Sequence, residues 1–332
     1  MAESSGLLAN SFEERIRELE ERSLSPLAVR SYETRGRAEH EEACSVRTPF
    51  QRDRDRIVHT KSFRRLMHKT QVFIDPAGDH YRTRLTHTLE VTSISRTVAR
   101  ALRLNEDLVE AIGLGHDLGH PPFGHIGEEV LDACLQRTFS RNFRHYEHSL
   151  RIVERLEPAP SSLRGAAAAG LNLTSQVRDG IVRHSSRAEL PATLEGRIVR
   201  LIDRVAYINH DIDDALRAGV LQAEALPREE IDLLGDSGSR RIDTLVHDLV
   251  EQSARAGDIV QSDRIGGAMS ALRTFMFERV YLQQEHAHIR ATIRRIFEDL
   301  VDEHGYTVED ATDYIAGMTD RFALAAAGGG GE

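Results

Sequence analysis

The stretch of sequence that decides the fold is HDLGHPPFGHIGE, residues 116–128. It places His116 beside Asp117 near the end of an apolar helical segment, and the proline pair at 121–122 stops that helix because proline has no N–H to donate. An imidazole and a carboxylate at a helix end can point to the same place. Such mixed nitrogen and oxygen ligands suit a divalent metal ion. The stretch therefore predicts a helix that ends at a metal site.

Outside this stretch, apolar residues recur every three to five positions and β-branched alternation is scarce, which is typical of helices. Asn105 is a predicted N-cap for the helix that leads into the stretch, and Gly219 is a predicted C-cap for a long helix. The pattern thus predicts an all-α fold. The expected helices outside the central one cover about residues 82–103, 125–137, 192–218, 238–256, 264–282 and 284–304.

Composition limits the class of protein. The 332 residues contain 43 Lys and Arg against 53 Asp and Glu, a net charge of −10, and 40% of them are hydrophobic. This apolar fraction is too high for a disordered chain, and the acidic balance argues against a dedicated duplex-DNA binder. Two cysteines, no apolar run long enough for a membrane span and no signal peptide indicate a cytoplasmic protein without membrane association.

Two residues outside the stretch can complete a metal site. The chain has 16 histidines, many of them between 80 and 148, and His87 belongs to this group on the preceding predicted helix. Asp203 stands among apolar residues on the long helix, where a carboxylate is costly to bury unless it is paired or bound to a metal.

The order His87, then His116-Asp117, then Asp203 resembles the signature of the HD-domain metal-dependent phosphohydrolases. Within that group, the chain resembles the deoxyguanosine triphosphate triphosphohydrolase family from about residue 46 to 324. The matching motifs lie at 50–59, 63–66, 68–73, 83–90, 115–127, 207–214, 241–248 and 313–322.

The resemblance implies a multi-helix HD-domain bundle with a C-terminal helical extension. We expect a partly flexible N-terminal arm over 1–45, the HD-type catalytic core over 46–220, a helical portion packed on it over 221–324, and a disordered tail over 325–332.

The resemblance also implies an activity, the hydrolysis of a deoxynucleoside triphosphate to deoxynucleoside and inorganic triphosphate, with dGTP or several dNTPs as substrates. The cofactor would be one divalent metal, Mn, Mg, Fe or Zn. Its expected ligands are His87, His116, Asp117 and Asp203.

By the same resemblance, His125, Glu128, His120 and His145 are the expected catalytic residues. His125 and Glu128 are three apart and therefore share a helix face, which suits a carboxylate that orients an imidazole for proton transfer. At 145–148 this chain has His-Tyr-Glu-His where the family commonly has His-Asn-Glu-Gln, so the roles of Tyr146 and His148 stay open.

Substrate contacts come from three parts of the chain. Asp203, Tyr207 and Asp211 follow each other by four residues and line one helix face. The resemblance implies that Tyr207 packs on the deoxyribose and excludes a 2′-OH, and that Asp211 binds the 3′-OH. The candidates for the triphosphate are Arg52, Lys69 and Arg84, and Gln71 is a candidate for the sugar or α-phosphate region.

Two other functions stay open. One is another hydrolase on the same scaffold, a 5′-nucleotidase or a cyclic-nucleotide phosphodiesterase. The other is a non-catalytic regulator that binds nucleotides or nucleic acid, with a structural metal. The resemblance also implies a homo-oligomer and a nucleotide or single-stranded DNA effector.

Overall fold

The protein is built from helices. The computed structural model describes residues 2–71, 82–159, 170–281 and 286–327. Within these ranges no β-strand is formed, and an isolated bridge joins Thr70 and Thr83, so the all-α prediction is confirmed. No described helix combines the length and the apolar character that crossing a membrane requires.

The α-helices are α1 (Ala2–Ser23), α2 (Pro49–Val58), α3 (Lys61–Arg65), α4 (Arg84–Ala101), α5 (Glu106–Gly115), α6 (Gly124–Phe139), α7 (His145–Arg151), α8 (Ser175–Arg183), α9 (Leu194–Arg217), α10 (Arg228–Leu234), α11 (Gly238–Ala256), α12 (Asp263–Met276), α13 (Ala287–Glu298), α14 (Val308–Ala316) and α15 (Asp320–Ala327). Short 3₁₀ and π turns add η1 (Leu66–His68), η2 (Ile152–Leu156), η4 (Ala223–Ala225), η5 (Phe277–Tyr281) and η6 (Asp299–Glu303).

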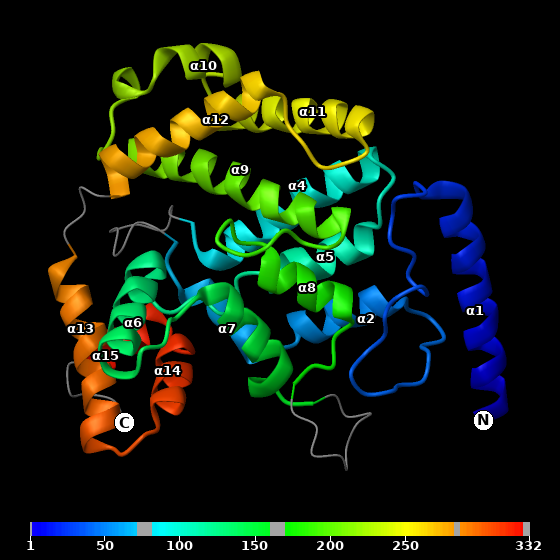
Figure 1. Cartoon of the computed structure of the whole chain (residues 1–332), viewed down its shortest axis with the longest axis horizontal. Helices are drawn as coiled ribbons and strands as arrows, with labels where there is room; N and C mark the ends of the chain where they lie inside the picture. The colour runs from blue at the N-terminus through cyan, green and yellow to red at the C-terminus, as the bar shows by residue number, and fades with distance from the viewer. Residues whose placement is uncertain (1, 72–81, 160–169, 282–285, 328–332) are drawn as a thin grey trace.

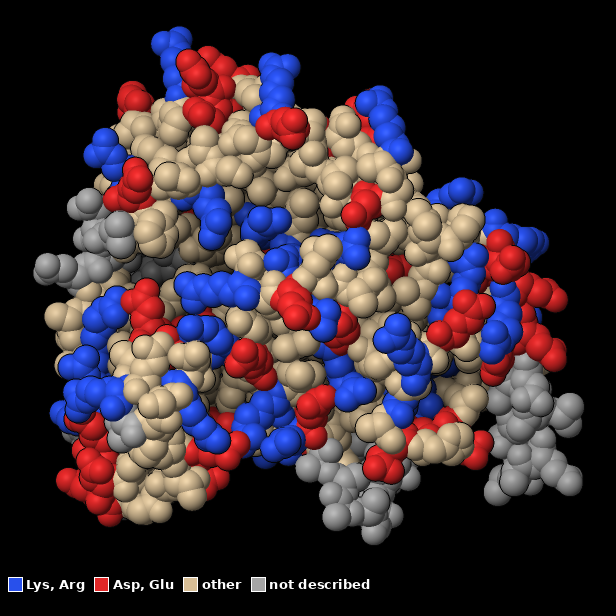
Figure 2. All heavy atoms as spheres, in the orientation of Figure 1, with Lys and Arg blue, Asp and Glu red and all other residues tan. Residues whose placement is uncertain are grey.

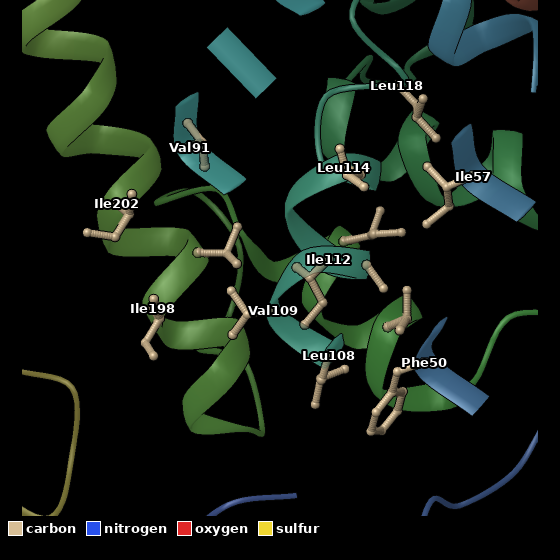
Figure 3. Packing of buried hydrophobic residues seen from close by; sticks show 14 of the residues in the cluster. Phe50, Ile57, Val91, Leu108, Val109, Ile112, Leu114, Leu118, Ile198 and Ile202 are labelled. Carbon is tan, nitrogen blue, oxygen red and sulfur yellow. The ribbon is translucent and has the colours of Figure 1, made fainter. Parts of the chain in front are cut away.

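The centre of the fold is α5, which is buried from Leu108 onward apart from Glu110. Figure 3 shows Val109 and Ile112 of α5 between Ile198 and Ile202 of α9 on one side and residues of α2 on the other. These side chains belong to one hydrophobic cluster that also includes Val91 of α4. A helix that is apolar all round is stable only when other helices cover it, which explains the layers on both sides.

Two smaller layers cover this centre. Helices α10, α11 and α12 lie over α9, and α13, α14 and α15 gather around α6 at the other end of the molecule (Figure 1). The metal-ligand candidates sit on α4, in the turn that follows α5, and on α9, so the central layer positions the site and the outer layers enclose it.

The ends of the chain lie at the periphery. α1 stands at one edge of the molecule (Figure 1), within the segment 1–45 that we expected to form an arm. α15 extends to Ala327, so the start of the expected tail 325–332 is helical, and residues 328–332 lie outside the described part of the chain. The domain boundaries given by the sequence stay predictions.

Helix ends follow the predicted caps with two differences. The Asn105 side chain accepts a hydrogen bond from the Leu108 amide at 3.2 Å, as expected of an N-cap. The segments 264–282 and 284–304 were expected to be helices throughout, but α12 ends at Met276 and α13 at Glu298, and each then widens into a π turn.

The decisive stretch also differs from expectation. α5 ends at Gly115, before the prolines, and residues 116–119 form a turn. The Ser149 hydroxyl of α7 explains this early end, because it donates to the His116 carbonyl at 2.7 Å and accepts from the Gly119 amide at 2.8 Å. These two hydrogen bonds take the place of backbone hydrogen bonds that would continue α5, and they attach the turn to α7.

Gly119 allows this close approach. A Cβ atom there would lie 2.2 Å from the Ser149 nitrogen and 2.3 Å from the His145 carbonyl oxygen, both of them backbone atoms that cannot easily move.

We expect Gly119→Ala to lower the free energy of unfolding by about 2–3 kcal/mol or more, measured by urea denaturation. The matched control is Gly267→Ala in α12, where a Cβ meets nothing within 4 Å; it should stabilise by about 0.5–1 kcal/mol. Equal effects of the two substitutions would contradict the close approach.

Candidate metal centre and active-site pocket

A pocket of about 310 Å³ opens between α9 and α12 on one side and α6 and the start of α7 on the other. Figure 2 shows Lys and Arg side chains gathered over the hollowed region between these two parts. The predicted site residues that line the pocket are Gln71, Arg84, His87, Asp117, His120, His125, Glu128, His145, Asp203 and Tyr207.

The four predicted metal ligands meet at the inner end of this pocket. One ligand atom each from His87, His116 and Asp117 lies within 4.8 Å of the others. The Asp203 Oδ1 atom is 3.1 Å from His87 Nε2 and 3.8 Å from His116 Nε2. Helix α4, the turn after α5 and helix α9 thus bring two imidazoles and two carboxylates together.

The hydrogen bonding of His116 fits a metal ligand. Its Nδ1 donates to the Gly113 carbonyl at 2.6 Å, because a carbonyl can only accept, so Nε2 carries the lone pair in the neutral ring. This Nε2 is buried and has no hydrogen-bond partner among the described residues. Metal-bound histidines commonly have this arrangement, with one ring nitrogen fixed by a carbonyl and the other on the ion.

The two carboxylates are held in the charged form that a cation requires. Burial works to raise the pKa of Asp117, but His116, His120 and Arg84 hold it well below its usual value. Burial also opposes ionisation of Asp203, and the hydrogen bond from His87 together with His116 lowers its pKa. The Arg84 guanidinium donates to Asp117 Oδ2 at 2.8 Å, so it joins the metal centre to the pocket wall.

Glu128 is hydrogen-bonded to His145 and lies close to His125. Its Oε2 accepts from His145 Nδ1 at 2.9 Å and lies 3.7 Å from His125 Nδ1, and its Oε1 accepts from the His145 backbone amide at 3.2 Å. Burial opposes ionisation, but the neighbouring His145 and His125 hold the pKa of Glu128 far below its usual value. The His120 ring stacks on His145 with centroids 3.9 Å apart. All four expected catalytic residues therefore lie in one cluster.

His184 is a site residue that the sequence did not reveal. It follows the last turn of α8, and its Nδ1 donates to the Ile181 carbonyl at 2.7 Å. Its Nε2 faces His145 Nε2 at 3.3 Å, and its ring lies 4.9 Å from that of His116. Burial and the nearby His116 and His145 lower the pKa of His184 to about 3. His184 thus links the metal centre to the Glu128 cluster.

The pocket wall carries arginines that the sequence also did not reveal. Arg204 follows Asp203 on α9, and Arg273 lies on α12. Together with Arg187 they have no carboxylate within 4.0 Å among the described residues, and the Arg204 Nε atom is buried without a hydrogen-bond partner. Two more lining arginines are paired, Arg144 with Asp132 and Arg290 with Glu129.

Tyr207 and Asp211 belong to one hydrogen-bonded group with Tyr281 of η5. The Tyr281 hydroxyl donates to Asp211 Oδ2, and the Tyr207 and Tyr281 rings lie 5.7 Å apart. Tyr207 lines the pocket, whereas Asp211 is buried behind it. Sequence spacing could not reveal Tyr281 as a partner of Asp211, because three α-helices lie between α9 and η5 along the chain.

The remaining expected substrate residues lie in different places. Gln71 lines the pocket, and its buried Oε1 has no hydrogen-bond partner among the residues that the structure describes. Lys69 does not line it, since its ammonium donates to the carbonyls of His120 at 2.6 Å and Ala316 at 2.8 Å. Arg52 is outside the pocket and pairs with Glu41 at 2.5 Å. Lys69 and Arg52 thus hold the fold together, and we no longer assign them to the triphosphate.

Comparison with known proteins gives one family. The HD-domain model matches residues 84–208, the part that contains all four metal-ligand candidates. The chain is 52% identical to a deoxyguanosinetriphosphate triphosphohydrolase-like protein of Caldanaerobacter subterraneus, over 92% of each chain. It is 44% identical to a protein of the same name from Desulfatibacillum aliphaticivorans, over 91% of this chain and 92% of that one.

A solved structure supports the fold alone. The crystal structure of a hypothetical protein from Aquifex aeolicus covers 82% of this chain and 67% of its own length, with a TM-score of 0.50 and 20% sequence identity. The HD-type, all-α architecture expected from the sequence is confirmed.

Asp211 gives a pH-dependent prediction. Burial raises its pKa to about 7 from the usual 3.8, so ionisation costs stability in the folded state. Below pH 3.8 the carboxyl is neutral in the folded and the unfolded chain and costs no stability. The free energy of unfolding should then fall as the pH rises from 3.8 to about 7. Asp211→Asn cannot ionise, so its melting temperature relative to the unmodified protein should increase between pH 5 and pH 8. The control is Asp232→Asn, an exposed carboxylate on α10. If the melting temperatures of Asp211→Asn and the unmodified protein differ by the same amount at both pH values, the pKa of Asp211 is not raised by burial.

Proposed function

Because this chain belongs to the family of deoxyguanosinetriphosphate triphosphohydrolase-like proteins and contains an HD domain, we propose that it hydrolyses a deoxynucleoside triphosphate to deoxynucleoside and inorganic triphosphate. The family supports a metal-dependent HD-type phosphohydrolase as the general class. The finer activity, on dGTP or several dNTPs, is our proposal. The observation that carries it is the metal-ligand set beside an acid–base cluster in a pocket with unpaired arginines.

His87, His116, Asp117 and Asp203 would hold the divalent ion, which is Mn, Mg, Fe or Zn. When bound, such an ion withdraws charge from a phosphoryl oxygen and thereby makes the phosphorus easier to attack. The partnerless His116 Nε2 and the ionised Asp117 and Asp203 support this ligand set.

His125 is the proposed proton donor or acceptor at the bond that breaks between the α-phosphorus and the 5′-oxygen. Its side chain is 51% exposed toward the pocket and has Glu128 behind it at 3.7 Å. The Glu128 carboxylate stabilises a protonated imidazole and orients its ring, which is the usual role of such a pair in proton transfer. His145 and His120, stacked beside Glu128, offer further donors for phosphate oxygens.

The triphosphate would bind to the pocket arginines. Arg187, Arg204 and Arg273 supply positive charge that no described carboxylate takes up, and Arg84 lies at the metal centre. Guanidinium groups bind phosphate oxygens through two parallel hydrogen bonds.

The sugar would rest on the Tyr207 ring, which leaves no room for a 2′-OH. Asp211, held by Tyr281, is the proposed acceptor for the 3′-OH. Gln71 remains a candidate for the sugar or the α-phosphate because it lines the same pocket.

The alternatives are less well supported. A 5′-nucleotidase or cyclic-nucleotide phosphodiesterase handles one phosphate and does not need several unpaired arginines. A non-catalytic regulator does not need Glu128 paired with two histidines. We extend the proposal to a cytoplasmic homo-oligomer that responds to a nucleotide or single-stranded DNA; its support is the resemblance together with the free Cys44 and Cys134.

The proposal is tested by incubating the metal-loaded protein with each dNTP and NTP and identifying the products by ion-exchange chromatography. We expect inorganic triphosphate and free deoxynucleoside from one or more dNTPs, and no product from NTPs. Hydrolysis of monophosphates alone, or release of single phosphates from the γ position, would contradict it.

Removal of Glu128 tests the acid–base assignment separately from the metal. Glu128→Ala should keep its metal content but lower kcat by about 100-fold or more, because proton transfer loses its supporting carboxylate. Metal content is measured by elemental analysis on the same sample. The control is Glu229→Ala, an exposed glutamate on α10. An unchanged kcat in Glu128→Ala would remove Glu128 from the mechanism.

A further inference from the structure

One motif of the family resemblance, residues 313–322, has no part in the mechanism proposed above. It spans the end of α14 and the start of α15, and none of its residues, all of which the structure describes, lines the active-site pocket. Its residue Asp320, the first of α15, nevertheless contacts two segments that help to form that pocket. The motif therefore reaches the site from the C-terminal layer.

Asp320 accepts three hydrogen bonds from these two segments. Its Oδ2 accepts from the Thr70 amide at 2.8 Å and from the Thr70 hydroxyl at 2.6 Å. Its Oδ1 accepts from the Phe123 amide at 2.9 Å. Both oxygens of one carboxylate are thus used to join two parts of the chain that are far apart in the sequence.

The hydrogen bond from Phe123 acts where the backbone is strained. Phe123 has φ 60° and ψ 25° and Gly124 has φ 57°, so two consecutive residues have a left-handed φ at the start of α6. A residue as bulky as Phe adopts this region only where its surroundings hold it there. Two contacts with α15 do so, because the Phe123 amide bonds to Asp320 and the Phe123 ring shares a hydrophobic cluster with Ala323.

The start of α6 decides where His125 lies. His125 follows Gly124 and is 51% exposed in the pocket, so its position depends on the backbone that carries it. Glu128 attaches the next turn of α6 to His145, whereas Asp320 attaches the residue at which the helix begins. A proton donor or acceptor must lie within hydrogen-bond distance of its target, so a displaced start of α6 would slow the reaction.

The hydrogen bonds from Thr70 act on the neighbouring wall of the pocket. Thr70 precedes Gln71, which lines the pocket. A Cβ atom at Gly124 would lie 2.6 Å from the Gln71 carbonyl oxygen and 2.9 Å from the Arg84 guanidinium, so the start of α6 fits tightly against both residues. Asp320 therefore holds the two sides of this contact together.

We propose that Asp320 is a positioning residue of the active site. It fixes the start of α6 against the Thr70–Gln71 segment and thereby places His125, without touching the substrate itself. The inference rests on the proposed function, because it assigns Asp320 a role in that reaction. It adds the C-terminal layer to the parts of the chain on which turnover depends.

The test compares Asp320→Asn with the unmodified, metal-loaded protein in steady-state hydrolysis of the dNTP that the unmodified protein hydrolyses fastest. Asn has one acceptor oxygen, and its amide nitrogen can only donate, so one of the two attachments is lost. We expect kcat to fall by about tenfold or more and KM to change by less than about threefold, since His125 is displaced but the pocket arginines are not. Metal content should stay the same.

The matched control is Asp263→Asn. Asp263 is exposed and is the first residue of α12, as Asp320 is of α15, so the two substitutions remove the same charge from the same place in a helix. Asp263→Asn should keep the kcat of the unmodified protein. An equal loss in both variants would overturn the positioning role.

A double variant separates positioning from a general loss of structure. If Asp320 acts through His125, adding Asp320→Asn to His125→Ala should lower kcat by less than about twofold, whereas independent effects multiply. Multiplied effects, or an unchanged kcat in Asp320→Asn alone, would overturn the proposal. If Asp320→Asn does not fold, Thr70→Val removes only the hydroxyl bond and should lower kcat by about twofold or more; an unchanged kcat would then overturn it.

Hydrogen exchange gives a readout that needs no turnover. Backbone amides over residues 120–126 should exchange about tenfold faster or more in Asp320→Asn than in Asp263→Asn, because the start of α6 has lost its attachment. Equal exchange in the two variants would overturn the attachment, whatever the activity. Absence of dNTP hydrolysis by the unmodified protein would instead contradict the proposed function, so the two failures can be told apart.

Discussion

The structure depends on keeping two carboxylates charged inside the protein. Asp117 and Asp203 are surrounded by helices α4, α5 and α9, where an isolated ionised carboxylate would cost several kcal/mol or more, on the order of the effective penalty for a buried ion. Three partners offset this cost: His87, His116 and Arg84. Yet within the described part of the chain His116 Nε2 is still without a hydrogen-bond partner. A divalent cation satisfies both needs, since it neutralises the carboxylates and accepts the lone pair.

This constraint shapes the surrounding chain. α5 is apolar on nearly all sides because it must lie at the centre to deliver His116 and Asp117. The turn after it is fixed to α7 through Ser149 and requires glycine at 119. The same attachment brings the start of α7 next to the metal centre, so His145 meets Glu128 of α6. The same attachment of the turn after α5 to α7 therefore both stabilises the fold and positions the side chains of the pocket.

The sequence predicted what depends on local spacing. Local spacing is enough to recognise the N-cap at Asn105 and the left-handed Gly219, which follows the Ala218 C-cap of α9. It also reveals the shared face of His125 and Glu128 and the apolar surroundings of Asp203. Residues whose role arises only from tertiary contact could not be found in this way. His184 is an ordinary residue at a helix end until α8 packs beside His116, and Arg273 meets Arg204 only because α12 lies on α9. Lys69 shows the opposite case. Its motif predicted a contact with the triphosphate, but its ammonium donates hydrogen bonds to two backbone carbonyls instead.

The most direct measurement of the central idea is a crystal structure of the protein grown with Mn²⁺, with data collected at the manganese absorption edge. The account predicts one strong anomalous peak bounded by His87 and His116 nitrogens and by Asp117 and Asp203 oxygens. A peak bound by other residues, or none at this place while all four side chains keep their positions, would contradict it.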